Sequence, residues 1–170
     1  MYKKISIIIP AYNENENILK LIHNILSINI NLKIIVVDDS SSKNKRLEKL
    51  NQKNKIHYLF RGKKLGRGSA VIDGLKFAKK KKFNTFIEMD ADFSHDPIEI
   101  KRNLEFFFKN KCDLLISSRY LKSSRIINWP ISRHILSYLA NKLIKICLNI
   151  PIVDFTNGFR IYSLRSVNKV

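Results

Sequence analysis

The chain has 170 residues, and its 32 Lys and Arg against 14 Asp and Glu give a formal net charge of +18 at pH 7. The length predicts one domain with a buried core, and the lack of an apolar run of about 18 residues or of a signal-peptide segment argues against a membrane-spanning or secreted protein. Cys112 and Cys147 lie far apart without a Cys-x-x-Cys or His pair, which predicts reduced core thiols of a cytosolic protein rather than a disulfide or a zinc site.

Apolar runs rich in β-branched residues alternate with stretches of helical periodicity, a pattern typical of an α/β fold with a mostly parallel sheet. We expect Pro10 to end the pairing of the first run, because proline lacks an N–H group. The predicted strands, in chain order, are residues 5–9, 33–37, 56–60, 83–89 and 113–118.

Helix starts follow several of these strands. Asn13 with Glu16 three residues later predicts a capped start of the first helix, and Gly66-Arg67-Gly68 predicts a tight turn before another. Asp96-Pro97 predicts a third start, and residues 131–148 form an amphipathic helix. The apolar stripes of the first and the last of these helices are Ile18, Leu19, Ile22, Ile25 and Leu26, and Ile135, Leu139, Leu143 and Ile146.

Two aspartates, Asp90 and Asp92, follow the strand at 83–89. Alternate residues of an extended chain point to one side, so the two carboxylates are able to converge on one cation. Carboxylate oxygens suit Mg²⁺ or Mn²⁺, which commonly shares its ligand shell with substrate phosphates. The alternative is that both aspartates only cap the turn that follows the strand.

Other polar residues follow other predicted strands. Ligands of open parallel sheets bind beyond the carboxyl ends of the strands. Tyr12 offers a stacking face there, Asp39 an acceptor for base or ribose donors, and the aspartate pair a metal for a diphosphate. These features predict a nucleotide-diphosphate site without a Rossmann or Walker glycine motif, since the spacing of Gly66-Arg67-Gly68 matches neither pattern.

These motifs together resemble the family 2 glycosyltransferases, and among them most of all the dolichyl-phosphate (polyprenyl-phosphate) mannosyltransferases. The matching segments are Ile9-Pro10-Ala11-Tyr12-Asn13-Glu14, Val37-Asp38-Asp39-Ser40-Ser41, Leu65-Gly66-Arg67-Gly68-Ser69-Ala70, Met89-Asp90-Ala91-Asp92-Phe93-Ser94-His95-Asp96-Pro97, Ser118-Arg119-Tyr120, Asn128-Trp129-Pro130 and Asn157-Gly158-Phe159-Arg160. The resemblance implies a nucleotide-diphospho-sugar transferase fold of the GT-A type, a Rossmann-like, mostly parallel sheet with flanking helices. It also implies that residues 1–170 form a single glycosyltransferase domain truncated at the C-terminus, because members continue beyond the Gly-Phe-Arg motif.

The resemblance also implies roles for individual residues. The catalytic residues are Asp92 and Arg119, and the metal, Mg²⁺ or Mn²⁺, is held by Asp90, Asp92 and Ser94. The residues that bind the nucleotide-sugar are Pro10, Tyr12, Glu14, Val37, Asp39, Asp90, Ala91, Asp92 and Arg119. The residues that bind the acceptor phosphate are Arg119, Arg133 and Ser137. Without the resemblance, Arg133 is equally well explained as a solvated arginine at a helix start, and Arg119 as a salt-bridge partner of a strand-end aspartate.

The chain departs from the family pattern in three places. Ser94 stands where some members have a glutamine that completes the metal shell, and Arg67 replaces an apolar residue of the glycine loop. The segment that carries further basic donor-binding residues in the family is missing after Arg160. The chain is therefore expected to be a fragment, a truncated form or an enzyme with impaired activity.

The implied reaction is inverting transfer of mannose from GDP-mannose to a polyprenyl or dolichyl phosphate. The acceptor is a phosphate monoester with a second pKa of about 6, so the site needs no general base, and His95 is interpreted as a loop residue. The lipid tail requires a bilayer, and Arg133, Lys142 and Lys145 of the helix at 131–148 suit an anionic surface. We expect a cytoplasmic protein, peripheral on the cytoplasmic face of a membrane, with a possible separate membrane-anchoring partner.

Three alternatives remain. One is another family 2 enzyme, which either uses another donor such as UDP-glucose on a lipid phosphate or glycosylates a saccharide. A saccharide acceptor would need a base carboxylate, such as Asp96 or Asp154. A truncated, non-catalytic nucleotide or lipid binder is the second. The charge alone favours a nucleic-acid-binding protein, but the lysine clusters lack interleaved stacking aromatics.

Overall fold

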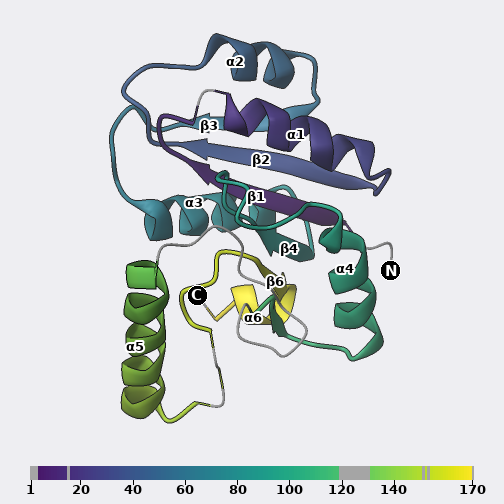
Figure 1. Cartoon of the computed structure of the whole chain (residues 1–170). Helices are drawn as coiled ribbons and strands as arrows, with labels where there is room; N and C mark the ends of the chain where they lie inside the picture. Colours follow the sequence, from purple (N-terminus) through teal and green to yellow (C-terminus); the bar gives the residue numbers. More distant parts are fainter. Residues whose placement is uncertain (1–3, 15, 119–130, 151, 153, 170) are drawn as a thin grey trace. The chain divides into compact units, whose positions relative to one another are not determined.

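The computed structural model describes residues 4–14, 16–118, 131–150, 152 and 154–169 (Figure 1). The chain divides into two compact units. The first comprises Met1–Leu115 and Phe159–Val170, and the second comprises Ile116–Gly158. The expected Arg119, Tyr120 and Asn128-Trp129-Pro130 lie outside the described residues.

A six-stranded sheet with the order β3-β2-β1-β4-β6-β5 forms the framework. Its strands are β1 (Ile5–Ala11), β2 (Leu32–Asp38), β3 (Ile56–Phe60), β4 (Thr85–Glu88), β5 (Leu114–Ile116) and β6 (Arg160–Ser163). β1 pairs in parallel with β2 and β4, β2 pairs in parallel with β3, and β6 is antiparallel to β4. The expected α/β fold with a mostly parallel sheet is confirmed.

The helices of the first unit are α1 (Asn17–Ser27), α2 (Lys45–Gln52), α3 (Arg67–Lys80), α4 (Glu99–Lys109) and α6 (Leu164–Val167), and they cover both faces of the sheet. The second unit contains α5 (Ile131–Leu148). One buried cluster joins Ile7 and Ile9 of β1 to α1, α2 and α4, and another joins Ile8 to α3 and α6. Figure 1 shows α1 and α3 on opposite sides of β1. Alternation along a buried strand produces this division, since successive side chains point to opposite faces.

The contact between α3 and β1 is unusually close at one glycine. A Cβ atom on Gly74 would lie 2.4 Å from Cγ2 of Ile8 and 3.2 Å from Cγ2 of Val37. A side chain at this position would therefore push the helix away from the sheet. Gly74 thus fixes how near α3, and the loop before it, lies to the ends of the strands.

Pro10 does not end the pairing of β1, contrary to expectation. It lies opposite Val37 of β2, and the ladder continues for one more pair. The carbonyl of Ile8 accepts from the N–H of Met89 at 3.1 Å on the β4 side, so Pro10, two residues later, also faces that side. The ladder with β4 has ended there at Ile8, so the missing N–H of Pro10 removes no ladder bond.

Two predicted helix starts are also corrected. Asn13 does not cap α1: its φ is 57°, and its N–H donates to Ser40 Oγ at 2.9 Å. The N-cap position is Glu16, whose side chain makes no capping bond. Asp96 does accept from the N–H of Ile98 at 3.0 Å, but it opens a turn and α4 begins only at Glu99.

The second unit contains α5, whose predicted bounds are confirmed. Three members of its predicted apolar stripe are not buried, since Leu139, Leu143 and Ile146 are each more than half exposed. Cys147 on the same helix is exposed too, so the prediction of a core thiol is wrong there, while the half-buried Cys112 packs against the first cluster. Within the described ranges, none of the helices is both long and apolar enough to cross a bilayer.

Candidate active site

The carboxyl ends of β2, β1 and β4 lie side by side, because these neighbours are parallel. Asp39 follows β2, Tyr12 follows β1, and Asp90 follows β4 by two residues. The prediction that polar side chains gather at this edge of the sheet is therefore confirmed for the first unit. This edge is the ordinary place for ligands in parallel sheets.

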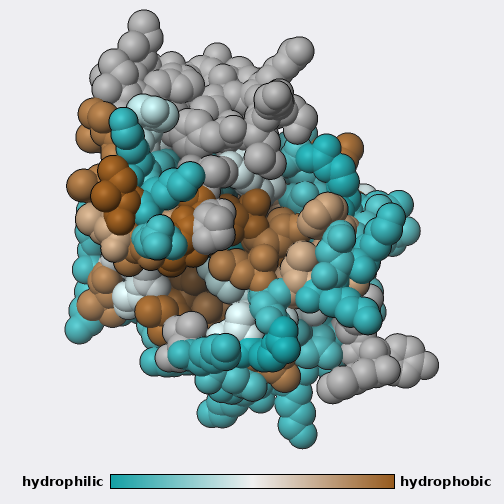
Figure 2. All heavy atoms as spheres, turned by 90° about the horizontal axis from the view of Figure 1, so that it is seen from below, coloured by the Kyte–Doolittle hydropathy of each residue, from teal (hydrophilic) through white to brown (hydrophobic). Residues whose placement is uncertain are grey.

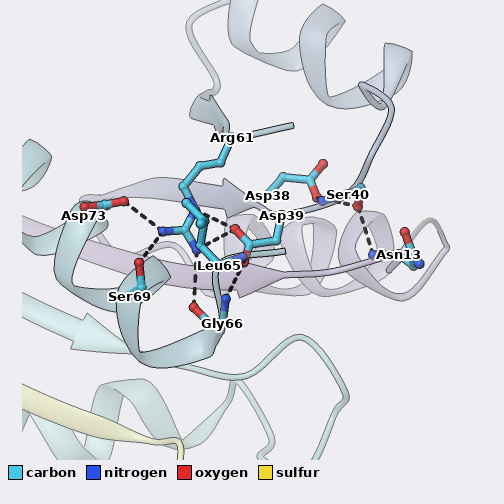
Figure 3. Close-up of polar contacts among 9 residues, drawn as sticks. All are labelled: Asn13, Asp38, Asp39, Ser40, Arg61, Leu65, Gly66, Ser69 and Asp73. Carbon is cyan, nitrogen blue, oxygen red and sulfur yellow. Dashed lines mark hydrogen bonds and ion pairs between the residues drawn. The ribbon is translucent and has the colours of Figure 1, made fainter. Parts of the chain in front are cut away.

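Asp39 is held by protein groups on both of its carboxylate oxygens (Figure 3). Oδ1 accepts from Nε of Arg61 at 2.5 Å, and Oδ2 accepts from the N–H groups of Leu65 and Gly66 at 2.8 and 2.9 Å. Side-chain exposure is 4% for Asp39 and 9% for Arg61. The orientation of the carboxylate is thus fixed without a ligand.

Arg61 also holds the start of α3. Its Nη1 donates to Ser69 Oγ at 2.7 Å and to Asp73 Oδ2 at 2.8 Å, and its Nη2 donates to the carbonyl of Gly66 at 3.2 Å (Figure 3). Gly66, with a φ of 93°, makes the turn that a side chain would strain, as the sequence predicted. The guanidinium therefore links the ends of β2 and β3 to α3.

Charge and hydrogen bonding shift the pKa values of this pair. Burial raises the pKa of Asp39, but the hydrogen bonds from Arg61, Leu65 and Gly66 lower it by more, so that it lies below its ordinary value. Burial lowers the pKa of Arg61, and its bonds to Asp39 and Asp73 raise it by more. Both groups are therefore charged at neutral pH.

The segment that binds Asp39 also reaches Asp90. Arg67, next to Gly66, donates from Nε to Asp90 Oδ1 at 2.6 Å and from Nη2 to Glu88 Oε1 at 2.6 Å. Burial lowers the pKa of the Arg67 guanidinium, and the charges of Asp90 and Glu88 raise it by more. Residues 65–67 thus connect the predicted nucleotide acceptor to the predicted metal ligand.

Glu88 is the most buried of the three side chains Arg67, Asp90 and Glu88, with an exposure of 2%. Its Oε2 accepts from the hydroxyl of Tyr162 at 2.6 Å. Burial, together with the Glu88 charge, raises the pKa of Tyr162 to about 12. The carboxylate is thus paired on both oxygens, as a buried charge requires.

Asp90 and Asp92 lie beyond β4, which ends at Glu88, so strand alternation does not govern them. The alternative, that the aspartates cap the turn after the strand, holds for one oxygen of the exposed Asp92. Its Oδ1 accepts from the N–H of Ser94 at 3.0 Å and from the Ser94 hydroxyl. Among the described residues, no three His, Cys, Asp or Glu side chains gather closely enough to hold a metal ion. Two carboxylates still fit Mg²⁺ or Mn²⁺, which is often bound by one or two carboxylates plus substrate phosphates.

The other predicted nucleotide residues differ in accessibility. Tyr12 is exposed, with Lys64 Nζ 4.5 Å from its ring centroid, and Glu14 accepts from the side-chain amide of Asn17 at 3.1 Å. The side chain of Val37 is buried in the cluster under α3, and Pro10 and Ala91 are buried as well. These buried residues shape the edge of the sheet and offer a ligand mainly backbone atoms.

A neighbouring set of bonds joins the loops after β1 and β2. Asp38 Oδ1 accepts from the N–H and hydroxyl of Ser40 at 2.9 and 2.5 Å, and Ser40 Oγ in turn accepts from Asn13 (Figure 3). Asp38 Oδ2 accepts from the Tyr58 hydroxyl at 2.7 Å. Burial raises the pKa of Tyr58, and Asp38 raises it further. The loop that carries Tyr12 is therefore tied to β2.

Arg61, Glu88 and Tyr162 were not predicted from the sequence. Arg61 directly follows β3, so the strand-end argument applied to Asp39 would have found it. Glu88 is hidden in an apolar strand, and only the antiparallel pairing of β6 brings Tyr162 to it. No local sequence signal marks that pairing.

The second unit holds the predicted acceptor residues. Arg133 lies in the first turn of α5, and Arg119 lies outside the described residues. Ser137 Oγ lies 3.2 Å from Thr156 Oγ1. Asp154 is buried, and its carboxylate accepts from Thr156 Oγ1 at 3.3 Å and from Asn157 Nδ2 at 3.4 Å. The role of each acceptor residue stays a prediction.

Comparison with known proteins identifies relatives along the whole chain. Residues 6–170 match the family model described as glycosyl transferase family 2. The chain is 33% identical over 168 residues to polyprenol monophosphomannose synthase of Mycolicibacterium smegmatis (96% of this chain, 63% of that protein). It is 40% identical over 139 residues to dolichol-phosphate mannosyltransferase of Pyrococcus furiosus (79% and 38%), and 31% identical over 167 residues to undecaprenyl-phosphate mannosyltransferase of Micrococcus luteus (95% and 68%). The chain thus spans between 38% and 68% of the length of these three relatives.

Solved structures agree on the fold. S. aureus TarS aligns with a TM-score of 0.63 at 19% identity (98% of this chain, 48% of that chain). M. tuberculosis glucosyl-3-phosphoglycerate synthase aligns with a TM-score of 0.61 at 18% identity (96% and 58%), and one structure of that protein contains Mn²⁺ and UDP. The GT-A type fold expected from the sequence is confirmed, and so is the resemblance to family 2.

Proposed function

The chain belongs to glycosyl transferase family 2, and we propose from this premise that it transfers mannose from GDP-mannose to a polyprenyl phosphate with inversion at the anomeric carbon. Three relatives at 31–40% identity carry names that describe mannose transfer to such a lipid phosphate. The chain covers only part of their length, so its own activity is the proposal.

One observation carries this proposal: residues 65–67 bind both Asp39 and Asp90. Asp39 is the proposed acceptor for base or ribose donors, and Asp90 the proposed ligand of the sugar-diphosphate metal. A single short segment holds both at one edge of the sheet. Tyr12, at the end of the strand between them, offers the stacking face for the base.

The proposed acceptor needs no general base, because a phosphate monoester with a second pKa of about 6 is ionised near neutral pH. Two carboxylates, Asp96 and Asp154, are candidates for the base that a saccharide acceptor would need. Asp154 is buried and accepts from Thr156 and Asn157, which supports a lipid phosphate over a saccharide hydroxyl. Asp96 is exposed and accepts from the N–H of Ile98 through one oxygen, and the Asp96→Asn variant tests it.

Charge placement is the proposed source of catalysis. A divalent ion held by Asp90, Asp92 and Ser94 would supply the positive charge that stabilises the departing diphosphate. In our proposal Arg119, Arg133 and Ser137 bind the lipid phosphate and align it with the anomeric carbon. Asp92 and Arg119 are the two residues whose loss we expect to affect the reaction most.

Contact with a membrane is part of the proposal, since the acceptor's tail is insoluble in water. Several apolar side chains of α5 are more than half exposed: Leu136, Tyr138, Leu139, Leu143, Ile146 and Leu148. Figure 2 shows hydrophobic side chains among hydrophilic ones at the surface. Lys142 and Lys145 on the same helix suit anionic lipid headgroups. We propose a peripheral location on the cytoplasmic face of a membrane, with or without an anchoring partner.

A donor panel tests the proposed function. Purified protein is incubated with Mn²⁺ or Mg²⁺, a short polyprenyl phosphate and radiolabelled GDP-mannose or UDP-glucose, and label is counted in the organic extract. We expect extractable label from GDP-mannose. Label from UDP-glucose instead would identify another donor, and nucleotide binding without any product would identify a non-catalytic binder.

A further inference from the structure

Arg67 places a positive charge directly on the proposed metal ligand. Its Nε lies 2.6 Å from Asp90 Oδ1 and its Nη2 2.6 Å from Glu88 Oε1. Side-chain exposure is 2% for Glu88, 27% for Asp90 and 44% for Arg67. The guanidinium therefore has a buried partner on one side and a more accessible partner on the other.

The buried partner explains why Arg67 stays in place. A carboxylate as buried as Glu88 needs a positive partner, and the other hydrogen bond to it comes from the neutral hydroxyl of Tyr162. The ion pair between Arg46 and Glu16 is a useful comparison, because both of its side chains are exposed (67% and 69%). Such an exposed pair forms and breaks freely, whereas the bond to Glu88 holds Arg67 beside Asp90.

We propose that Arg67 is an internal cation that competes with a divalent metal ion for Asp90. The inference rests on the proposed function only in taking Asp90 as a metal ligand. Mg²⁺ binds carboxylate oxygens at about 2.0–2.1 Å. The guanidinium occupies Oδ1 of Asp90, and its positive charge repels an ion that approaches either oxygen of that carboxylate. When the ion binds, Arg67 gives up Asp90 and keeps Glu88.

This exchange has a consequence for the metal-free protein. With Arg67 in place, the charge of Asp90 is already partly balanced, so the site tolerates a metal-free state. The affinity for the ion is lower than the two carboxylates alone would provide. A bound diphosphate, which adds negative charge next to Asp90, shifts the competition toward the ion.

Binding of Mn²⁺ alone tests the proposal. Free Mn²⁺ is measured by electron paramagnetic resonance during titration of the wild-type protein, Arg67→Gln and the matched variant Arg46→Gln, with folding checked by circular dichroism. Arg67→Gln keeps a hydrogen-bond donor near Glu88 and removes the charge, and we expect its Kd to be at least tenfold lower than that of the wild type. Arg46→Gln removes the same charge from α2 and should change the Kd less than twofold. In the double variant Arg67→Gln/Asp90→Asn, the gain in Mn²⁺ affinity over the wild type should be lost.

A second measurement on the wild-type protein covers the case in which Arg67→Gln fails to fold. The Nε–H resonance of Arg67, assigned by its loss in Arg67→Lys, is followed by NMR during titration with Mg²⁺. Release from Asp90 should increase its exchange with water severalfold. Equal Mn²⁺ affinities of wild type and folded Arg67→Gln, including no binding by either, would overturn the inference, as would an Nε–H resonance that Mg²⁺ leaves unchanged. Neither readout depends on mannose transfer, so a protein that fails only the transfer assay contradicts the proposed function and leaves the competition standing.

Discussion

Arg61 holds the carboxylate of Asp39 through two nitrogens, since Nε and Nη2 each lie 2.5 Å from Oδ1. The other oxygen accepts from two backbone N–H groups. These four donors use the lone-pair sites that a carboxylate ordinarily offers. A nucleotide that uses Asp39 as its acceptor therefore has to share an oxygen with one of these donors or displace it.

Arg61→Ala should reduce both stability and nucleotide binding. The substitution leaves the buried Asp39 without its positive partner, which costs about 3–5 kcal/mol of the free energy of unfolding. Urea unfolding measures the loss. Arg46→Ala, which removes an exposed arginine, should cost less than about 1 kcal/mol. Equal stabilities for the two variants would contradict the role assigned to Arg61.

Acid should weaken the fold partly through Asp39. Its pKa in the folded protein lies below the ordinary value, so the unfolded chain takes up a proton first as the pH falls. The stabilisation from ionised Asp39 is therefore complete above about pH 4 and is lost as the pH falls through the lowered pKa. Urea unfolding between pH 6 and pH 2.5 should show a steeper decline for the wild type than for Asp39→Asn. Parallel curves would show that Asp39 does not contribute.

Two glycines of α3 should respond to alanine in opposite directions. Gly74→Ala forces a Cβ to within 2.4 Å of Ile8, and overpacking of this kind costs about 1–3 kcal/mol. Gly68→Ala meets nothing within 4 Å, so the better helix propensity of alanine should stabilise the protein by up to about 1 kcal/mol. Thermal unfolding separates the two effects. A Gly74→Ala variant as stable as Gly68→Ala would mean that α3 does not approach β1 this closely.

The exposed side chains of α5 should contribute to membrane binding. Leu139→Asn combined with Leu143→Asn should weaken binding to vesicles of anionic lipid by about tenfold or more, because each buried leucine contributes about 1.5–3 kcal/mol. Sedimentation with vesicles measures the effect. Phe106→Asn on α4 removes an equally exposed apolar side chain from a different helix and serves as the control. Equal binding by both variants would contradict a membrane-facing α5.

Much of the fold was predictable because its signals are local. The strand at Ile56–Phe60 and the helix at Ile131–Leu148 have the bounds that their apolar patterns predicted. The start of α1 was not predictable, because Asn13 takes a left-handed backbone and bonds to Ser40 from the loop after another strand. A capping pattern contains no information about such a distant partner.

In the candidate site, too, some features follow from local sequence signals and others depend on residues far apart in the chain. The positions of Asp39 and Asp90 at the edge of the sheet follow from their places after predicted strands of a parallel sheet. Arg61 directly follows β3, so the same argument reaches it, whereas Arg67 reaches Asp90 only when α3 packs on the sheet at Gly74. The bond between Glu88 and Tyr162 likewise depends on β6 returning antiparallel to β4.

The most direct test of the central claim is mannose transfer by Asp92→Asn. Asp92 is a proposed ligand of the ion that stabilises the departing diphosphate, so we expect the organic-extractable product to fall at least about 100-fold. Asp96→Asn, which changes a nearby carboxylate that accepts from Ile98, should retain most of the activity. An Asp92→Asn variant that transfers mannose at the wild-type rate would contradict the account.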